Sequence, residues 1–221
     1  MKIAFINPNS TASMTADIVR SARAALPGAD IVGLTNDKGP PAIQGREDGD
    51  AAIPGLLSLI PQAQAQGADA LVIACFDDTG LEEARAAASC PVLGIGQSSY
   101  VMAHLLGMRF SVITSLAVSI PVIENNVRDG GFAGHCASVR ASGLPVLTIE
   151  RAEPTTIARI AEEIELAIRH DGGRCVVLGC AGMAPLRETL AARTGVPIID
   201  GVAAAATLAQ AVVTGMALQP R

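Results

Sequence analysis

Two cysteines that end similar apolar runs are the residues of this sequence best suited to chemistry. Residues 70–75 read ALVIAC and residues 175–180 read CVVLGC, so Cys75 and Cys180 each close a run of small and branched apolar side chains. Such runs are typical of buried strands in parallel sheets. Because ligands bind beyond the carboxyl ends of parallel strands, we predict that each cysteine is the last residue of a strand and faces a substrate site.

A pair of thiols can invert the configuration of a carbon atom. A thiolate removes a proton from one face of the carbon, and a thiol returns a proton to the opposite face. A free thiol has a pKa of ~8.5, and the N-terminus of a helix lowers that pKa. After Cys75, Thr79 and Glu82 match a capping box that would start a helix. After Cys180, Pro185 suits the first position of a helix.

The charges that follow the two cysteines differ. Asp77 and Asp78 follow Cys75, whereas the residues after Cys180 are the uncharged run 181–183. Negative charge near a thiol raises its pKa. We therefore expect Cys180 to ionise more easily and to be alkylated faster than Cys75.

The surroundings of the two cysteines form an internal repeat. Each cysteine is followed by leucine after six positions, by glutamate after eight, and then by a second short strand that begins with proline at position 91 or 197. Upstream, the apolar segments that start at residues 2 and 109 lie 73 and 71 positions before their cysteines. The repeat predicts two similar halves whose thiols face each other across a cleft.

The pattern along the chain predicts an α/β fold of two pseudo-symmetric four-stranded parallel-sheet domains flanked by helices, with the active site in the cleft between them. We expect the first domain, with Cys75, to comprise residues 1–96 plus 202–221, and the second, with Cys180, residues 97–201. Pro54 and Pro61 predict that a helix over 51–66 is kinked, short or late in starting. Strands are expected at 3–6, 31–34, 71–75, 92–95, 110–114, 137–141, 175–179 and 197–199, and helices at 14–26 and 154–169.

The composition narrows the classes of partner and location. The 221 residues carry a net charge of -5 without a basic cluster, which argues against a nucleic-acid surface. The uncharged segment 201–218 is rich in alanine and interrupted by polar residues, which favours a buried helix over a membrane span. The apolar run at the start is too short for a signal peptide, so we expect a cytoplasmic protein with reduced cysteines.

Other candidate motifs do not predict a cofactor. No two cysteines have the spacing of a zinc ribbon, and His104, His135 and His170 lie near no cysteine cluster except Cys136, so no metal is expected. The sequence Gly-Ile-Gly at 94–96 lacks the third glycine of a dinucleotide fingerprint. The polar segments 7–11 and 114–115 follow predicted strands and are equally consistent with helix caps and with ligand loops. Cys90, Cys136 and Cys175 fit the role of buried apolar residues.

Together these motifs resemble the aspartate/glutamate/hydantoin racemase superfamily, and most closely its hydantoin and allantoin racemase branch. The resemblance spans nearly the whole chain. It rests on INPNS at 6–10, GP at 39–40 with isoleucine at 43, ACFDD at 74–78 with GL at 80–81, LGCAGM at 178–183 and GVPIIDG at 195–201.

The resemblance implies two catalytic cysteines, Cys75 and Cys180, that work without pyridoxal phosphate, metal or any other cofactor. It also implies that backbone amides around both cysteines stabilise a planar enolate. The substrate pocket would be formed by Pro8, Asn9, Ile43, Phe76, Asp77, Thr114, Ala181, Gly182 and Met183.

Two departures from the superfamily pattern bear on the substrate. Amino-acid racemases of the superfamily usually have Asn-Thr after the first cysteine and Thr-His after the second, where this chain has Phe76-Asp77 and Ala181-Gly182. The missing hydroxyls would hold an α-carboxylate, so a ring amide is favoured over a free amino acid. Arylmalonate decarboxylases of the superfamily keep one of the two cysteines, and this chain has both.

The sequence therefore predicts a cofactor-independent racemase of 5-substituted hydantoins or of a related ureide such as allantoin. An amino-acid racemase of the aspartate/glutamate type is the alternative enzyme. A binding module without catalysis, with both cysteines as buried apolar residues, is the alternative from another class. We expect a small-molecule substrate, no nucleic-acid or membrane partner, and a homo-oligomer.

Overall fold

The computed structural model describes residues 1–217, and its first four strands form one all-parallel sheet in the order β2-β1-β3-β4. Residues 218–221, which end the predicted first domain, lie outside the described part. The elements of this half are β1 (Lys2–Asn7), α1 (Ala12–Ala25), β2 (Asp30–Thr35), α2 (Arg46–Ala65), β3 (Ala70–Ile73), α3 (Leu81–Ala87) and β4 (Val92–Gly94).

The last four strands form a second all-parallel sheet with the equivalent order, β6-β5-β7-β8. The predicted fold class is thus confirmed, and all eight expected strands are present. The elements are α4 (Ile95–Leu105), β5 (Phe110–Thr114), η1 (Ala117–Ser119), α5 (Ile120–Asp129), β6 (Cys136–Ala141), α6 (Val146–Glu150), α7 (Pro154–His170), β7 (Cys175–Gly179), η2 (Ala181–Leu186), α8 (Arg187–Thr194), β8 (Ile198–Asp200) and α9 (Gly201–Ala217).

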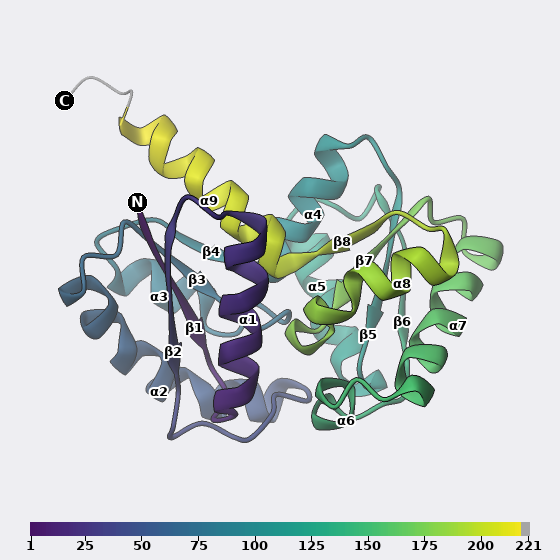
Figure 1. Ribbon diagram of the computed structural model, residues 1–221, viewed down its shortest axis with the longest axis horizontal. Coiled ribbons are helices and arrows are strands. Elements are labelled where there is room, and N and C mark those ends of the chain that lie inside the picture. Colours follow the sequence, from purple (N-terminus) through teal and green to yellow (C-terminus); the bar gives the residue numbers. More distant parts are fainter. Residues whose placement is uncertain (218–221) are drawn as a thin grey trace.

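The two sheets lie side by side with helices between them and helices outside them (Figure 1). Alternate residues of a strand point to opposite faces of its sheet, and this alternation divides the core. Ile3, Phe5 and Val72 belong to a central core shared with Val112 and Val177 of the second sheet. The intervening residues of β1 and β3 instead pack against α2 and α3. The shared core holds the carboxyl ends of the two sheets in a fixed relation.

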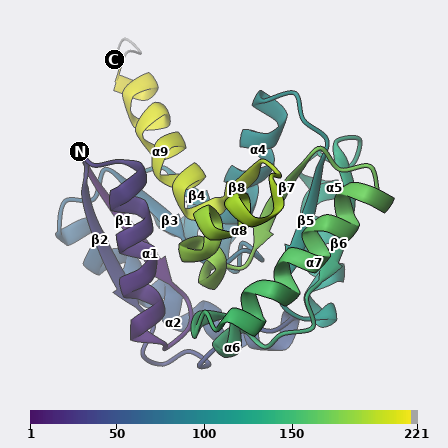
Figure 2. The same ribbon diagram turned by 45° about the vertical axis from the view of Figure 1, so that its right-hand side comes forward.

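Helices α4 and α9 lie between the two sheets and contact each other. Helix α9 packs against α1 and β3 of the first half and also against β7 and β8 of the second. Its far end projects from the body of the molecule in both views (Figures 1 and 2). No helix within residues 1–217 is long and apolar enough to cross a membrane. The domain boundaries at 96 and 202 stay a prediction.

Helix α2 differs from the prediction because it is long and starts early. It has 20 residues and begins at Arg46, five residues before the expected segment, although it contains Pro54 and Pro61. Both prolines are exposed. The carbonyl groups that lose a backbone partner to a proline therefore lie on the solvent side, where water can replace the lost hydrogen bond. The expectation of a short or late helix was wrong for this reason.

Candidate active site

The two predicted thiols border one cavity at the carboxyl ends of β1, β3, β5 and β7. Its volume is about 30 Å³, which is roughly the space that one water molecule occupies in the liquid, ~30 Å³. The strands stop short of the thiols. Strand β3 ends at Ile73 and β7 at Gly179, so Cys75 and Cys180 lie in the turns that follow, not at the last strand residues as predicted. The cavity is lined by Asn9, Met14, Ile43, Ala74, Cys75, Phe76, Asp77, Thr114, Ser115, Ser119, Val146, Gly179, Cys180 and Ala181.

Eight of the eleven predicted site residues line this cavity, and three do not. Pro8 is buried in the loop between β1 and α1, and its carbonyl oxygen accepts a hydrogen bond from the Asn36 side chain at 2.9 Å. Gly182 and Met183 are also buried outside the lining, and their contact with the site is made by backbone amides. The eight that line it are Asn9, Ile43, Cys75, Phe76, Asp77, Thr114, Cys180 and Ala181.

Several lining residues had no functional signal in the sequence. In the sequence Met14 is an ordinary apolar residue of a predicted helix. In the structure its sulfur accepts a hydrogen bond from the Asn9 side chain at 3.2 Å. Ser119 lies five positions after Thr114 in the short helix η1, and Val146 begins α6. Serine at a helix start ordinarily indicates capping, and Val146 belongs to α6, a short helix that has no equivalent between β2 and α2, so the repeat did not reveal either residue.

The Cys75 thiol receives hydrogen bonds from its own loop. The Thr79 hydroxyl donates to Sγ at 3.5 Å, and the Asp77 backbone amide donates to the same sulfur. Burial nevertheless raises the pKa of Cys75 strongly, and the negative charge of Asp77 raises it further. The predicted capping box is wrong. Helix α3 begins at Leu81 after Gly80, whose φ of 68° is left-handed, and the Thr79 hydroxyl is used by the thiol.

The Cys180 thiol receives its hydrogen bonds from backbone alone. The amides of Gly182 and Met183, in the first turn of η2, donate to Sγ. Burial raises the pKa of Cys180 to about 11, and the charge of Asp77 also raises it. Pro185 lies inside η2 and α8 begins only at Arg187, so this proline does not occupy the first α-helical position that was predicted. Tight 3₁₀ turns place their first amides next to the preceding side chain, which explains how this thiol is held without a side-chain donor.

The two aspartates after Cys75 have different partners. The Asp78 carboxylate accepts hydrogen bonds from the backbone amides of Gly96 and Gln97 at the start of α4, at 2.9 and 2.7 Å. A Cβ atom on Gly94 would lie 2.0 Å from that carboxylate, so the Gly-Ile-Gly segment makes room for Asp78. Asp77 lines the cavity, and within residues 1–217 its carboxylate has no hydrogen bond or ion pair. Burial raises the pKa of both carboxyl groups to about 7.

The segment 7–11 contributes to the cavity but gives α1 no side-chain cap, because Thr11 occupies the N-cap position without a side-chain hydrogen bond to the helix. The Asn9 side chain lines the cavity, and its oxygen accepts hydrogen bonds from the Thr11 amide at 2.9 Å and from the Asn7 side chain at 2.9 Å. The equivalent segment of the second half contributes Thr114 and Ser115 to the cavity. The Thr114 hydroxyl donates to the carbonyl oxygen of Gly179 at 3.0 Å, which ties the end of β5 to the turn before Cys180.

Two hydrogen bonds join the halves near the cavity. The Val146 amide donates to the Gln44 side chain at 3.0 Å, and the Ser13 hydroxyl donates to Glu150 at 2.5 Å. Figure 2 shows α6 beside the beginning of α1, where these bonds form.

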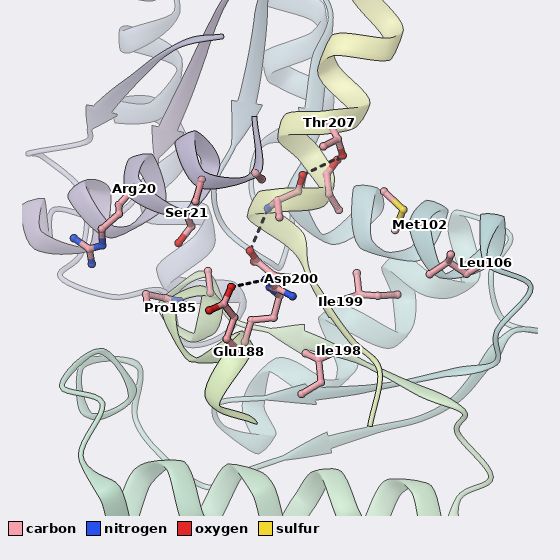
Figure 3. A pocket seen from close by; sticks show the side chains of 16 residues that line it. Arg20, Ser21, Met102, Leu106, Pro185, Glu188, Ile198, Ile199, Asp200 and Thr207 are labelled. Carbon is pink, nitrogen blue, oxygen red and sulfur yellow. Dashed lines mark hydrogen bonds and ion pairs between the residues drawn. The ribbon is translucent and has the colours of Figure 1, made fainter. Parts of the chain in front are cut away.

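A wider groove of about 570 Å³ lies elsewhere, between α1, α4, α9 and the η2–α8 segment (Figure 3). Its one buried carboxylate, Asp200, accepts hydrogen bonds from the amides of Val202 and Ala203 and thereby caps α9. Neither thiol lines it. Across residues 1–217, no three histidine, cysteine or acidic side chains are grouped as metal ligands. The cavity with the two thiols is therefore the site with paired acid and base groups.

The comparisons with known proteins agree with the fold. A family model described as Asp/Glu/Hydantoin racemase matches residues 3–209. A protein named hydantoin racemase from Rhizobium meliloti is 48% identical over 96% of this chain and 88% of its own length. One of the same name from Pseudomonas sp. (strain NS671) is 37% identical over 96% of this chain and 86% of its own.

Solved structures extend the similarity to three dimensions. The allantoin racemase from Klebsiella pneumoniae has a TM-score of 0.93 and 37% identity, over 98% of this chain and 89% of that one. A glutamate racemase from Francisella tularensis, at 16% identity and a TM-score of 0.70, shares the fold, over 99% of this chain and 83% of that one. The expectations of a racemase-type fold and of an isomerase are confirmed, and the chain belongs to the Asp/Glu/Hydantoin racemase family.

Proposed function

We propose that this racemase acts on a 5-substituted hydantoin or a related ureide such as allantoin, with Cys75 and Cys180 as its acid–base pair and without a cofactor. The observation that carries the proposal is the shared cavity, which brings one thiol from each half of a pseudo-symmetric fold to a single site. A reaction that interconverts mirror images needs equivalent groups on both faces of the reacting carbon.

The proposed reaction has two proton transfers. The thiolate of one cysteine takes the proton from the carbon between the ring carbonyl and the ring nitrogen, which leaves a planar enolate. The thiol of the other cysteine then gives its proton to the opposite face, so the second cysteine ends as the thiolate. Donors that meet each sulfur, among them the amides of Gly182 and Met183, favour the thiolate form against the cost of burial.

The charge of the cavity favours a neutral ring over a free amino acid. Among the residues that line it, all within the described range 1–217, none is cationic and one, Asp77, is acidic. An α-carboxylate would have no opposite charge to pair with and would be repelled by Asp77. The relatives named hydantoin racemase and the allantoin racemase structure add support for a cyclic ureide.

A panel of pure enantiomers tests the proposal. Single enantiomers of several 5-substituted hydantoins, allantoin, aspartate and glutamate are incubated with the enzyme in heavy water after dialysis against a chelator. We expect optical rotation to be lost, with deuterium entering the stereocentre, for a hydantoin or allantoin only. Racemisation of aspartate or glutamate alone would favour the alternative enzyme. Exchange with no compound of the panel would favour a binding module, and activity that returns only with a divalent metal would contradict cofactor independence.

A cytoplasmic location and a homo-oligomeric state belong to the same proposal. All five cysteines are free thiols, as expected in a reducing compartment. The large apolar side chains of Leu105, Leu106, Val118 and Met216 are more than half exposed, and contact with a second copy would bury exposed apolar surface of this kind. Sedimentation velocity over a range of protein concentrations tests the oligomer. A single monomeric species at micromolar concentration would contradict it.

A further inference from the structure

The carboxylate of Asp77 is the one charged group of the cavity that the fold leaves uncommitted. Its neighbour Asp78 is fully engaged by two backbone amides at the start of α4. Asp77 has no such partner within residues 1–217, although its side chain is half-buried in the wall of the cavity. A carboxyl group that lines the cavity with both thiols and forms no hydrogen bond within this range is free to exchange a proton.

The backbone of Asp77 is anchored on both sides. Its amide donates to Sγ of Cys75, and its carbonyl oxygen accepts a hydrogen bond from the Asn126 side chain of α5 at 2.8 Å. These two bonds come from opposite halves of the protein. They fix the direction in which the side chain leaves the main chain, and thus hold the carboxyl group at the cavity.

The charge of Asp77 acts on both thiols. Asp77 lines the same cavity as both thiols, and its negative charge raises the pKa of Cys75 and that of Cys180. In the internal repeat the position equivalent to Asp77 is Gly182, which has no side chain. The site therefore contains two thiols and a single carboxyl group shared between them.

A two-thiol racemase, which is the function proposed above, has to restore its starting form after each turnover. If Cys75 begins as the thiolate, it ends as the thiol, and Cys180 ends as the thiolate. A second molecule of the same enantiomer needs the first form again. One proton must therefore move from Cys75 to Cys180, and both thiols line the same cavity.

We propose that Asp77 is the proton relay that interconverts the two thiolate forms of the free enzyme. In its neutral form it gives the carboxyl proton to the Cys180 thiolate, so an O–H bond breaks and an S–H bond forms. The resulting carboxylate takes the proton from the Cys75 thiol, so that S–H bond breaks and the carboxyl O–H bond is restored. One negative charge and two protons are present among the three groups throughout. A carboxyl pKa raised to about 7 by burial brings its proton affinity closer to that of a thiol, which makes the exchange easier.

The test compares two rates at saturating substrate. Net racemisation of a single enantiomer needs the relay after every turnover. Exchange of label between the two enantiomers of a racemic mixture does not need the relay. Each conversion of one enantiomer leaves the enzyme in the form that converts the opposite enantiomer. Asp77→Asn should lower the net rate by about 100-fold while the exchange rate stays near that of the parent. Asp77→Gly, which copies the residue of the second half, gives a second variant without a carboxyl group should the first fail to fold.

Glu83→Gln is the matched control, because it removes an exposed negative charge from the same segment, at a site remote from the cavity. It should leave both rates unchanged. Equal rates in Asp77→Asn and the parent, or an equal fall of both rates, would overturn the relay, since a structural role lowers both together. Failure of the proposed function has a different signature, because the parent enzyme itself would then not racemise any ureide.

Discussion

The loop after Cys75 and the loop after Cys180 hold equivalent thiols by different means. In the first, a hydroxyl from Thr79 and one backbone amide meet the sulfur, and a carboxylate lies beside it. In the second, two backbone amides of a 3₁₀ turn meet the sulfur, and no acidic side chain is present in the turn. The two sheets have the same strand order, so this difference arises after the strands end.

The pseudo-symmetry therefore extends to the ends of the strands, and it is lost in the loops that hold the thiols. In the proposed reaction both sulfurs reach the same carbon from opposite faces, and the repeated sheets bring both thiols to one cavity. The hydrogen-bond donors to each thiol come from the loop that contains that cysteine. Side-chain donors can be removed by substitution, whereas backbone amides cannot, so the two halves should respond differently to mutation.

The largest effect is expected from removal of either thiol. Cys75→Ala and Cys180→Ala should each lower the rate of racemisation by at least about 100-fold, because each removes an acid or base from one face. Polarimetry on a single enantiomer measures the loss. Cys90→Ser, at a half-buried thiol that does not line the cavity, is the matched control and should keep the parent rate. A Cys180→Ala variant as active as the parent would remove the second half from the mechanism.

A smaller effect should follow the loss of the hydroxyl donor to Cys75. Thr79→Val keeps the shape of the side chain but raises the pKa of Cys75 further. We expect kcat/KM to fall about 10-fold, and equally in both directions, because the two enantiomers have equal free energy. Thr79→Ser should restore most of the rate. Alkylation of Cys75 should slow while that of Cys180 does not, and equal slowing at both thiols would point to a general structural defect.

The comparison also predicts the order of alkylation in the parent enzyme. Burial raises the pKa of both thiols, but the charge of Asp77 is the second largest influence on Cys75 and only a lesser one on Cys180. Cys180 should therefore react about 10-fold faster with iodoacetamide near neutral pH. Peptide mapping after brief treatment measures both sites. Preferential labelling of Cys75 would contradict the stated effect of the carboxylate.

The smallest effect concerns stability. The pKa of Asp77 is about 7 in the folded protein and ~3.9 when unfolded, so the folded state holds the proton more tightly. The free energy of unfolding therefore loses a contribution as the pH rises from about 4 to about 7. Asp77→Asn does not titrate. The free energy of unfolding of this variant, relative to that of the parent, should rise by on the order of 1–2 kcal/mol between pH 4.5 and pH 8, as measured by urea unfolding.

Asp78→Asn serves as the contrast for this measurement. Asp78 has a similarly raised pKa, but its carboxylate also accepts two backbone hydrogen bonds at the start of α4. Replacing one oxygen by an NH₂ group removes one of those acceptors and should destabilise the protein at both pH values. A stability gain in Asp78→Asn as large as that in Asp77→Asn would contradict the different roles assigned to the two carboxylates.

The fold could be predicted from sequence because its signals are local and repeated. Short branched runs alternate with helical segments, and the repeat around Cys75 and Cys180 predicts two sheets of the same order. Helix α2 was mispredicted because proline is unfavourable in a helix only where its effect cannot be relieved, and the exposure of Pro54 and Pro61 depends on how the helix packs.

The lining of the cavity could be predicted where residues lie at a strand end or within two positions of it, as Cys75, Thr114 and Cys180 do. It could not be predicted where a short-range motif competes with a tertiary contact. Thr79 has the spacing of a helix cap, yet its hydroxyl bonds the thiol. Likewise Val146 enters the cavity from α6, a short helix that the segment between β2 and α2 lacks, and the glycines at 94 and 96 are explained by the carboxylate of Asp78.

The assignment of one thiol to each face of the reacting carbon is tested most directly by hydrogen exchange in heavy water. Cys75→Ser and Cys180→Ser are each incubated with each pure enantiomer, and the proton at the stereocentre is followed by NMR. A serine hydroxyl is too weakly acidic to serve as the base, so each variant keeps a base on one face only. We predict that both variants lose racemisation, that each variant exchanges the proton of a single enantiomer, and that the two variants act on opposite enantiomers. Exchange of the same enantiomer by both variants would contradict it.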